Sequence, residues 1–405
     1  MAKLKIVHEK IKEALTRSVA EVYPSRNAFE KALLSGKKLR FYIGFDPTNP
    51  NLHLGHTMGL MKIHEFQELG HEIIILIGDF TARIGDPTDK LAVRKPLTKA
   101  EVKKNFTTYK KQISKIIHFS GTNPAKVMFN SAWHDKMKFA DVLALAENFT
   151  VQQMIERDMF QKRLQEQKPI GLHEFLYPVM QGYDSVAMDV DVEVGGSDQI
   201  FNMLAGRDLL RKMKGKEKFV VAIKLLEDPA SGKKMSKTEH ALINISDEPK
   251  DMYGKVMALP DSGIVPFFEM ATRIPFDEVK KIEHNLAKGI LHPKDAKMRL
   301  AKEITEMYHD AKKALQAEEY FIATFSKKTT SEHTPELVVT QNSLSLLDLV
   351  VFAGIQSKSE AKRLIAQRAV EIDGDTKTNE KDIVPIHTGI ILRVGKHKVF
   401  KIKHT

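Results

Sequence analysis

The chain has 405 residues, 42% of them hydrophobic and 28% charged, and a formal net charge of +11 at pH 7. This length predicts two or three domains with cores of their own, and the balanced composition excludes an intrinsically disordered chain. The absence of cysteine excludes disulfide scaffolds, thiolate catalysis and cysteine-ligated zinc.

The excess of positive charge favours a polyanionic partner such as nucleic acid or a phosphorylated ligand, but it is equally compatible with a merely soluble basic protein. The N-terminus has no apolar segment of the kind that signal peptides contain, and the apolar run at 73–77 is too short to span a bilayer. We therefore expect a cytoplasmic protein without a membrane partner.

Between residues 39 and 224, short β-branched runs alternate with longer segments of helical period. Helices are predicted at 55–69, where Gly70 follows in the position that a helix C-terminus prefers, and at about 98–117. This alternation is typical of a doubly wound parallel sheet, so residues 1–228 are predicted to form a Rossmann-like α/β nucleotide-binding domain. The five predicted strands are 39–45, 72–78, 126–130, 188–194 and 219–224.

Beyond this domain, charged amphipathic helices are predicted at 275–288 and 293–325. We assign residues 229–326 to a basic loop and a helical domain, and the polar stretch 327–342 to a linker. Residues 343–405 are predicted to form a small α+β domain, in which Asp373-Gly374 makes a turn after the first of two strands, 369–372 and 390–394.

The motif His53-Leu54-Gly55-His56 lies where a turn-rich loop meets the start of the helix predicted at 55–69. The free N–H groups and the dipole of a helix N-terminus favour phosphate, and Gly55 lets a flat base approach the backbone. The two imidazoles can donate to phosphate oxygens as charge develops. Taken alone, the same residues also fit a capped helix start with a buried histidine.

A second motif, Lys234-Met235-Ser236-Lys237-Thr238, follows the last predicted strand of the α/β domain. Lysines on a mobile loop can follow a leaving pyrophosphate, although a solvated basic loop would have the same sequence.

The two motifs, in this order on one α/β domain, resemble the signatures of class I aminoacyl-tRNA synthetases. The sequence departs from them at Leu54, where Ile is usual, and at Thr238, where Ser is usual. Further stretches are similar to the tyrosyl-tRNA synthetase branch of that family: 41–48, 84–90, 177–184 and 194–199. The resemblance covers nearly the whole chain and implies ATP-dependent activation of L-tyrosine, followed by transfer of tyrosine to the 3′ end of tRNA(Tyr).

Tyr177, Gln181 and Asp184 are spaced so that a helix presents all three on one face. A polar face with a carboxylate suits a zwitterionic, phenol-bearing ligand, but an ordinary half-exposed helix has the same pattern. The resemblance implies that Tyr42 and Asp184 bind the phenol hydroxyl of the substrate, and that Gln199 lies near its carboxylate. It assigns the substrate ammonium group to Asp86, Tyr177 and Gln181.

For the nucleotide, the resemblance implies that Asp198 accepts a hydrogen bond from the ribose of ATP. Other ATP-binding residues implied are Asp46, Gly55, His56, Lys234 and Lys237. The residues expected to stabilise the phosphates during the reaction are Thr48, His53, His56, Lys90, Arg94, Lys234 and Lys237. Mg²⁺ is expected to accompany ATP, held by phosphates and water and not by a dedicated set of protein ligands.

The segment 356–365 predicts a helix that Ser357 and Glu360 begin as a capping box. Lys358 and Lys362 fall on one face, and the buried stripe is Ala361, Leu364 and Ile365. With the strand and turn that follow, this tail resembles an S4 RNA-binding domain, and it implies contacts to tRNA by Lys358, Lys362 and Arg363. A solvated basic helix is the alternative.

Three other functions share part of this pattern: a tryptophan-specific class I synthetase, an adenylyltransferase with the first motif, and an RNA-binding relative without catalytic activity. The tryptophan enzymes do not normally carry the S4-like tail or the pair Tyr42 and Asp184. A homodimer is an expectation from the family alone.

Overall fold

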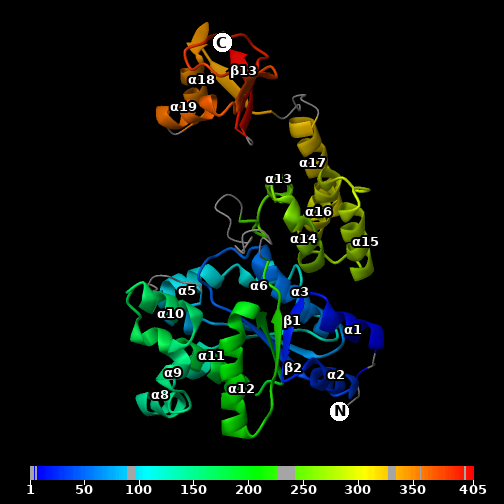
Figure 1. Ribbon diagram of the computed structural model, residues 1–405, viewed down its shortest axis with the longest axis vertical. Helices are drawn as coiled ribbons and strands as arrows, with labels where there is room; N and C mark the ends of the chain where they lie inside the picture. The colour runs from blue at the N-terminus through cyan, green and yellow to red at the C-terminus, as the bar shows by residue number, and fades with distance from the viewer. Residues whose placement is uncertain are drawn as a thin grey trace. The chain divides into compact units, whose positions relative to one another are not determined.

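A six-stranded sheet forms the centre of the first of two units into which the chain divides, Met1–Asp310 and Ala311–Thr405. The computed structural model describes residues 4, 7–88, 97–226, 242–326, 334–355, 357–395 and 398–405 (Figure 1). The strands of the first unit are β1 Val19–Tyr23, β2 Arg40–Phe45, β3 Glu72–Ile77, β4 Lys126–Phe129, β5 Val192–Gly196 and β6 Phe219–Ile223.

The strands lie in the order β1-β6-β5-β2-β3-β4. Strands β2 to β6 are parallel, and β1 pairs antiparallel with β6 at the edge. From β2 the chain proceeds outward to β3 and β4, and it then returns to place β5 on the other side of β2. The order therefore reverses between β2 and β5, which is the point where open α/β sheets bind their ligands. The doubly wound prediction is confirmed.

Strand β5 begins four residues later than predicted. Met188 ends a helix, and Asp189 follows in the left-handed conformation with φ of 50°. Met188, Val190 and Val192 are all buried, so the alternation of apolar residues that marks a strand extends back into the helix end. The antiparallel edge strand β1 was not predicted.

Helix α3 (Leu54–Glu68) matches its prediction, and Gly70 follows with φ of 92°. The predicted helix 98–117 is instead two shorter ones, α5 (Lys99–Phe106) and α6 (Tyr109–Ile113). The other helices of the first unit are α1 His8–Thr16, α2 Arg26–Leu34, α4 Thr81–Ile84, α7 Ser131–His134, α8 Phe139–Ala146, α9 Val151–Ile155, α10 Asp158–Gln165, α11 Leu176–Met188, α12 Ile200–Lys214, α13 Pro249–Met257, α14 Ile264–Ala271, α15 Phe276–Ala287 and α16 Pro293–Tyr308, with 3₁₀ turns η1 Leu172–Phe175, η2 Ser197–Gln199 and η4 Asp261–Gly263.

Helices α3 and α11 cover opposite faces of the sheet. On β2, Ile43 packs so closely on α3 that a Cβ at Gly59 would lie 2.5 Å from its Cδ1 atom. The neighbouring Tyr42 reaches α11, where its hydroxyl lies 3.0 Å from Ser185 Oγ. Because successive strand residues point to opposite faces, these two contacts place one helix on each side. Figure 1 likewise shows α11 and α12 on one side of the sheet, and α1 and α2 toward the other.

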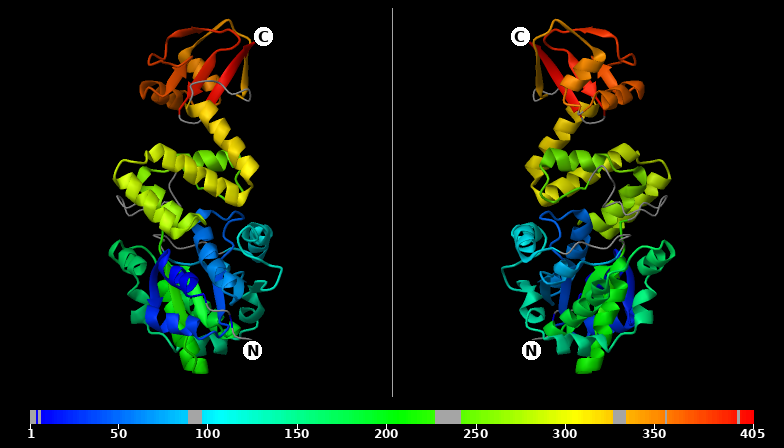
Figure 2. Two further views of the ribbon diagram at one scale, coloured as in Figure 1. Left: turned by 90° about the vertical axis from the view of Figure 1, so that its right-hand side faces the viewer. Right: turned by 90° about the vertical axis from the view of Figure 1, so that its left-hand side faces the viewer.

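The second unit contains a five-stranded sheet in the order β10-β9-β12-β13-β7 and a two-stranded sheet of β8 and β11. Helices α18 and α19 pack on it through buried residues such as Leu349 and Ile365 (Figure 2). This confirms a small α+β domain. Its elements are α17 Ala311–Phe321, the π-helical turn η5 Ile322–Ser326, β7 Glu336–Val339, β8 Ser343–Ser345, α18 Leu346–Phe352, α19 Lys358–Ala366, β9 Val370–Ile372, β10 Asp375–Thr376, β11 Ile383–Pro385, β12 Ile391–Val394 and β13 Lys398–His404.

Two predictions near the boundary between the units differ from the structure. The single helix predicted at 293–325 is divided into α16 and α17 at His309 and Asp310. The predicted linker 327–342 contains β7, which pairs in parallel with β13. Val339 is fully buried, so the polar composition of this stretch concealed a strand whose apolar residues belong to the core of the second unit.

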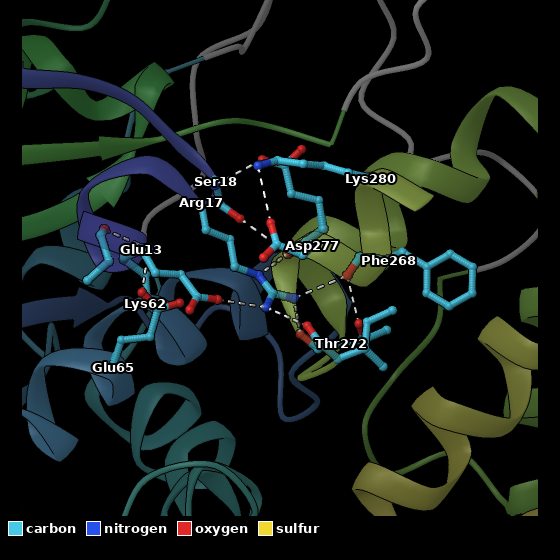
Figure 3. A network of polar contacts seen from close by, with 12 residues as sticks. Glu13, Arg17, Ser18, Lys62, Glu65, Phe268, Thr272, Asp277 and Lys280 are labelled. Carbon is cyan, nitrogen blue, oxygen red and sulfur yellow. Dashed lines mark hydrogen bonds and ion pairs between the residues drawn. The ribbon is translucent and has the colours of Figure 1, made fainter. Parts of the chain in front are cut away.

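Arg17 connects the N-terminal segment to the end of α14. Its guanidinium donates to the backbone carbonyls of Phe268 (3.3 Å), Glu269 (2.8 Å), Thr272 (2.8 Å) and Ile274 (2.7 Å) (Figure 3). These carbonyls belong to the last turn of α14 and the residues after it, where a helix leaves acceptors without intrahelical partners and a cation is favoured by the dipole. The buried guanidinium thus secures the helical segment to the sheet.

We expect Arg17→Leu to lower the free energy of unfolding by roughly 2–4 kcal/mol, because it leaves several buried carbonyls without a donor. Urea denaturation followed by circular dichroism measures the change. The control is Lys10→Leu, which removes an exposed ion pair of 3.8 Å with Glu68 and should change stability by less than about 1 kcal/mol. Equal effects of the two substitutions would contradict the role given to Arg17.

Candidate active site

A cavity of about 330 Å³ opens at the carboxyl ends of β2 and β5. Its wall comes from both strands, from the start of α3 and from the polar face of α11. All the predicted tyrosine- and ATP-site residues that fall within the described part of the chain line it: Tyr42, Asp46, Thr48, His53, Gly55, His56, Asp86, Tyr177, Gln181, Asp184, Asp198 and Gln199.

The two histidines of the first motif form the N-terminal cap of α3. His53 Nδ1 accepts from the Gly55 N–H at 3.1 Å, and His56 Nδ1 accepts from the His53 N–H at 3.2 Å. Because each Nδ1 is an acceptor, a neutral ring carries its proton on Nε2. Helix capping and cavity lining therefore coexist, and capping fixes which ring nitrogen of each histidine can donate.

The loop that leads into this motif is held from outside by α5 and α6. Asn105 donates to the Pro47 carbonyl at 2.9 Å, and Tyr109 donates to the Asn49 carbonyl at 2.7 Å. Gln112 donates to the Pro50 carbonyl at 2.8 Å. Sequence analysis did not find these supporting residues, since none of them belongs to a recognisable motif.

Asp46 joins β2 to two other parts of the cavity wall. Its Oδ1 accepts from the Thr81 hydroxyl at 2.7 Å, and its Oδ2 accepts from the Tyr177 hydroxyl at 2.9 Å. Burial, reinforced by the charge of Asp46, raises the pKa of Tyr177 well above its ordinary value. A Cβ at Gly78 would lie 2.0 Å from Asp46 Oδ1, so only glycine leaves room for this carboxylate.

Asp184 is buried on α11 and receives hydrogen bonds from side chains that follow β4. The Trp133 Nε1–H donates to Oδ1 at 2.8 Å, the His134 Nε2 lies 2.7 Å from the same oxygen, and the Asn130 amide donates to Oδ2 at 3.2 Å. Burial raises the pKa of Asp184, while the hydrogen bond and charge of His134 act in the opposite direction. The three partners were missed, although their place at the carboxyl end of a parallel strand was a usable signal.

Further acceptor atoms belong to other residues that line the cavity. Asp86 Oδ2 accepts from the Gln199 amide at 2.8 Å, and Asp86 Oδ1 accepts from the Thr88 hydroxyl at 2.7 Å. The Gln181 amide donates to Glu193 Oε1 at 3.2 Å, while Gln181 Oε1 is buried and has no partner among the described residues. An unpaired buried acceptor favours a ligand with N–H or O–H groups.

Residues 34–326 match the family described as tRNA synthetases class I (W and Y). The chain belongs to this family.

Relatives of this class I synthetase include the tyrosine--tRNA ligase of Moorella thermoacetica, which is 46% identical over 96% of this chain and 95% of its own length. The tyrosine--tRNA ligase of Carboxydothermus hydrogenoformans is 43% identical over 96% of this chain and 97% of its own. The tyrosyl-tRNA synthetase of Archaeoglobus fulgidus, solved with L-tyrosine, aligns with a TM-score of 0.62 at 25% identity and covers 76% of this chain and 99% of its own.

Four predicted residues of this synthetase, Lys90, Arg94, Lys234 and Lys237, lie outside the described residues. Among the groups that are described, no cluster of three or more His, Cys, Asp or Glu could hold a metal ion. No helix in the described ranges is long and apolar enough to cross a membrane.

The predicted helix of the tail is α19, and Ser357 Oγ accepts from the Glu360 N–H as its N-cap. Ala361 and Ile365 are buried as expected. Lys358 is exposed, and Lys362 is exposed and pairs with Glu380 at 3.0 Å. Arg363 is also exposed, so the structure leaves all three predicted tRNA-binding side chains at the surface of the second unit.

We expect the melting temperature of Asp184→Asn to gain on that of the wild type as pH rises from 4.5 to 7.5, because the variant lacks a carboxylate whose ionisation is opposed by burial. The pKa of Asp184 in the folded chain is raised above that in the unfolded chain, so the folded state loses stability as pH rises through this interval. The gain of the variant should therefore shrink when melting is measured at pH 4.5.

The matched control is Asp135→Asn, for which the sign reverses. The hydrogen bond from Lys99 lowers the pKa of Asp135, so the carboxylate stabilises the fold above the unfolded pKa and the variant should lose stability at pH 7.5. The same sign for both variants would refute this account of Asp184.

Proposed function

We propose that this protein activates L-tyrosine with ATP to tyrosyl-adenylate and transfers tyrosine to the 3′ end of tRNA(Tyr). The observation that carries the proposal is one cavity lined both by a hydroxyl-binding pair, Tyr42 and Asp184, and by the histidine motif. The names of the relatives support the same substrate.

The phenol hydroxyl of tyrosine would lie between Tyr42 and Asp184. The carboxylate, already held by neighbouring donors, would accept the phenol proton, and the Tyr42 hydroxyl would donate to the phenol oxygen. Phenylalanine would offer no acceptor to the Tyr42 hydroxyl and no donor to the remaining acceptor site of Asp184, which is a strong basis for rejection. Tyrosyl-tRNA synthetase is the worked example of that general rule, so the present site is consistent with it and does not derive it.

This pairing also favours tyrosine over tryptophan, the other substrate of the family. An indole N–H could donate to Asp184, but it offers no lone pair to the Tyr42 hydroxyl. The ammonium group of the substrate would be bound by Asp86, Tyr177 and Gln181, which all line the cavity. We assign the substrate carboxylate to the neighbourhood of Gln199.

ATP would bind across the start of α3, with the adenine over Gly55 and the ribose at Asp198; Asp46 lines the same part of the cavity. We assign the phosphates to Thr48, His53 and His56, and to the predicted residues Lys90, Arg94, Lys234 and Lys237. Mg²⁺ would arrive with ATP, held by phosphate oxygens and water.

Activation requires no nucleophile from the protein. The carboxylate of tyrosine attacks the α-phosphate, a bond forms between them, and pyrophosphate leaves with the bonding electrons. Negative charge shifts toward the leaving oxygens in the transition state, where the Nε2–H groups of His53 and His56 are oriented as donors by their caps. The terminal ribose hydroxyl of tRNA then attacks the adenylate carbonyl and displaces AMP.

The second unit would bind the tRNA body through Lys358, Lys362 and Arg363, and the helices α13 to α16 would contribute further contacts. Such binding rests mainly on phosphates and should weaken as salt concentration rises.

We also propose a homodimer through the segment between α8 and η1. Large apolar side chains are exposed there: Phe139 (77%), Leu143 (50%), Val151 (69%) and Leu172 (81%). Figure 1 shows α8, α9 and α10 together at one edge of the first unit. Exposed apolar side chains that gather on one surface are typical of a protein interface.

The function is tested by amino-acid-dependent exchange of labelled pyrophosphate into ATP with each of the twenty amino acids. Exchange should occur with tyrosine. Exchange with tryptophan alone, or with no amino acid, would overturn the proposal.

Asp184→Ala should raise the KM for tyrosine about 10- to 100-fold, the effect of losing a hydrogen bond to a charged group. His56→Ala should lower kcat about 100-fold and leave the KM for tyrosine nearly unchanged, since its donor acts in the transition state.

The dimer is tested by small-angle scattering of the wild-type protein and of the double variant Phe139→Asp, Leu172→Asp. The scattering mass should fall from two chains to one in the variant. Ile290→Asp is the control, because Ile290 is 70% exposed but lies outside the segment. A wild-type mass of one chain would refute the dimer.

A further inference from the structure

A buried ion pair lies at the wall of the cavity in the first unit, which one of its members, Glu193, lines. Lys218 precedes β6 and Glu193 lies on β5, and their side chains are 0% and 4% exposed. Lys218 Nζ forms an ion pair with Glu193 Oε2 and also donates to Ser185 Oγ at 2.8 Å. Removing two charges from water costs several kcal/mol per ion, so such a pair is a poor means of stabilising a sheet.

The protein makes room for this lysine. Gly206 on α12 lies against it, and a Cβ at that position would be 2.6 Å from Lys218 Nζ and 2.7 Å from Ser185 Oγ. Burial lowers the pKa of Lys218, and the charge of Glu193 opposes that shift. Lys218, Ser185 and Gly206 are thus packed against one another on the α11 face of the sheet.

The arrangement continues to the wall of the cavity. Ser185 Oγ lies 3.0 Å from the Tyr42 hydroxyl and 3.4 Å from Glu193 Oε2. An ammonium group has only donors, so Ser185 must accept from Lys218. The single serine proton is then available to Tyr42 or to Glu193, and the shorter distance favours Tyr42. In that orientation Tyr42 accepts a hydrogen bond from Ser185, and its own proton is free to be donated to another group.

Glu193 would compete for the Tyr42 proton if it stood alone. Burial, followed by the charge of Glu193, raises the pKa of Tyr42 well above its ordinary value. Lys218 occupies Glu193 Oε2, and Gln181 donates to Oε1. Glu193 remains within hydrogen-bonding reach of the Tyr42 hydroxyl, but these two donors reduce its demand for the Tyr42 proton.

We propose that Lys218, Glu193 and Ser185 are positioning residues that fix the direction of the hydrogen bond from Tyr42 to the substrate. The chain of donors runs from Lys218 to Ser185, from Ser185 to the Tyr42 oxygen, from Tyr42 to the substrate phenol oxygen, and from the phenol to Asp184. The inference rests on the proposed function, because it needs the phenol between Tyr42 and Asp184. The inference predicts that the site prefers a substrate whose para substituent both accepts a hydrogen bond from Tyr42 and donates one to Asp184.

The test compares tyrosine with 4-aminophenylalanine in pyrophosphate exchange. An aromatic amine can donate to Asp184, but it is a poor acceptor for Tyr42. Ser185→Ala removes the fixed proton direction while it leaves the ion pair in place, so the Tyr42 hydroxyl can turn and accept from the amine. We expect the ratio of kcat/KM for tyrosine to that for 4-aminophenylalanine to fall roughly fivefold, the effect of one neutral hydrogen bond.

A double variant, Lys218→Met with Glu193→Gln, removes both charges together and avoids a single buried charge. Its fold is checked by circular dichroism, and the same fall in the ratio is expected. The control is Thr305→Val, which changes a fully buried hydroxyl on α16 and should leave the ratio unchanged.

The decisive comparison is Ser185→Ala in a Tyr42→Phe background, where it should have no further effect on the ratio. An undiminished effect there would mean that Ser185 acts through packing, and it would overturn the inference. Tyr42→Phe alone distinguishes failure of the proposed function from failure of the positioning role given to Ser185. If it reduces the preference for tyrosine over phenylalanine while Ser185→Ala changes nothing, the proposed function stands and the inference fails.

Discussion

The adjacency of two parallel strands, β2 and β5, is the constraint on which the site depends. The chain leaves β2 in one direction and returns to β5 from the other, so the connections at their carboxyl ends diverge and leave a cavity between them. The loop after β2 brings Asp46 and the histidine motif, and the turn after β5 brings Asp198.

Polar groups in the cavity wall are held in place by hydrogen bonds from neighbouring side chains. Asp184 is fixed by Asn130, Trp133 and His134, and the loop before α3 is fixed by side chains of α5 and α6. Burying Asp184 is unfavourable to its ionised form, and the surrounding donors compensate in part. A buried carboxylate held in this way is well suited to select a hydroxyl group, because a ligand without one leaves its remaining acceptor site without a donor.

The same sheet supports the site from both faces by different means. On one face, α3 approaches Ile43 so closely that a side chain at residue 59 would have to displace that of Ile43, and this packing brings the N-terminus of α3 to the cavity. On the other face, Tyr42 meets a polar group of α11. Tyr42 and Ile43 are neighbours on β2, yet one lies on the polar face at the site and the other on the apolar face against α3. A slip of one residue would exchange the two faces and destroy the site.

The sequence by itself determined the parallel α/β domain, because the β-branched runs and helical periods are local, and it determined the composition of the site through motifs. It misplaced the start of β5, where buried Val190 continues the apolar alternation, and it treated the strand Glu336–Val339 as linker, because the partner strand β13 lies more than sixty residues away along the chain. Only the tertiary structure decided the partners of Asp184, the buried pair Lys218 and Glu193, and the reach of Arg17 to the end of α14. These contacts join residues that are distant in sequence, and local sequence patterns do not predict which distant groups will come into contact.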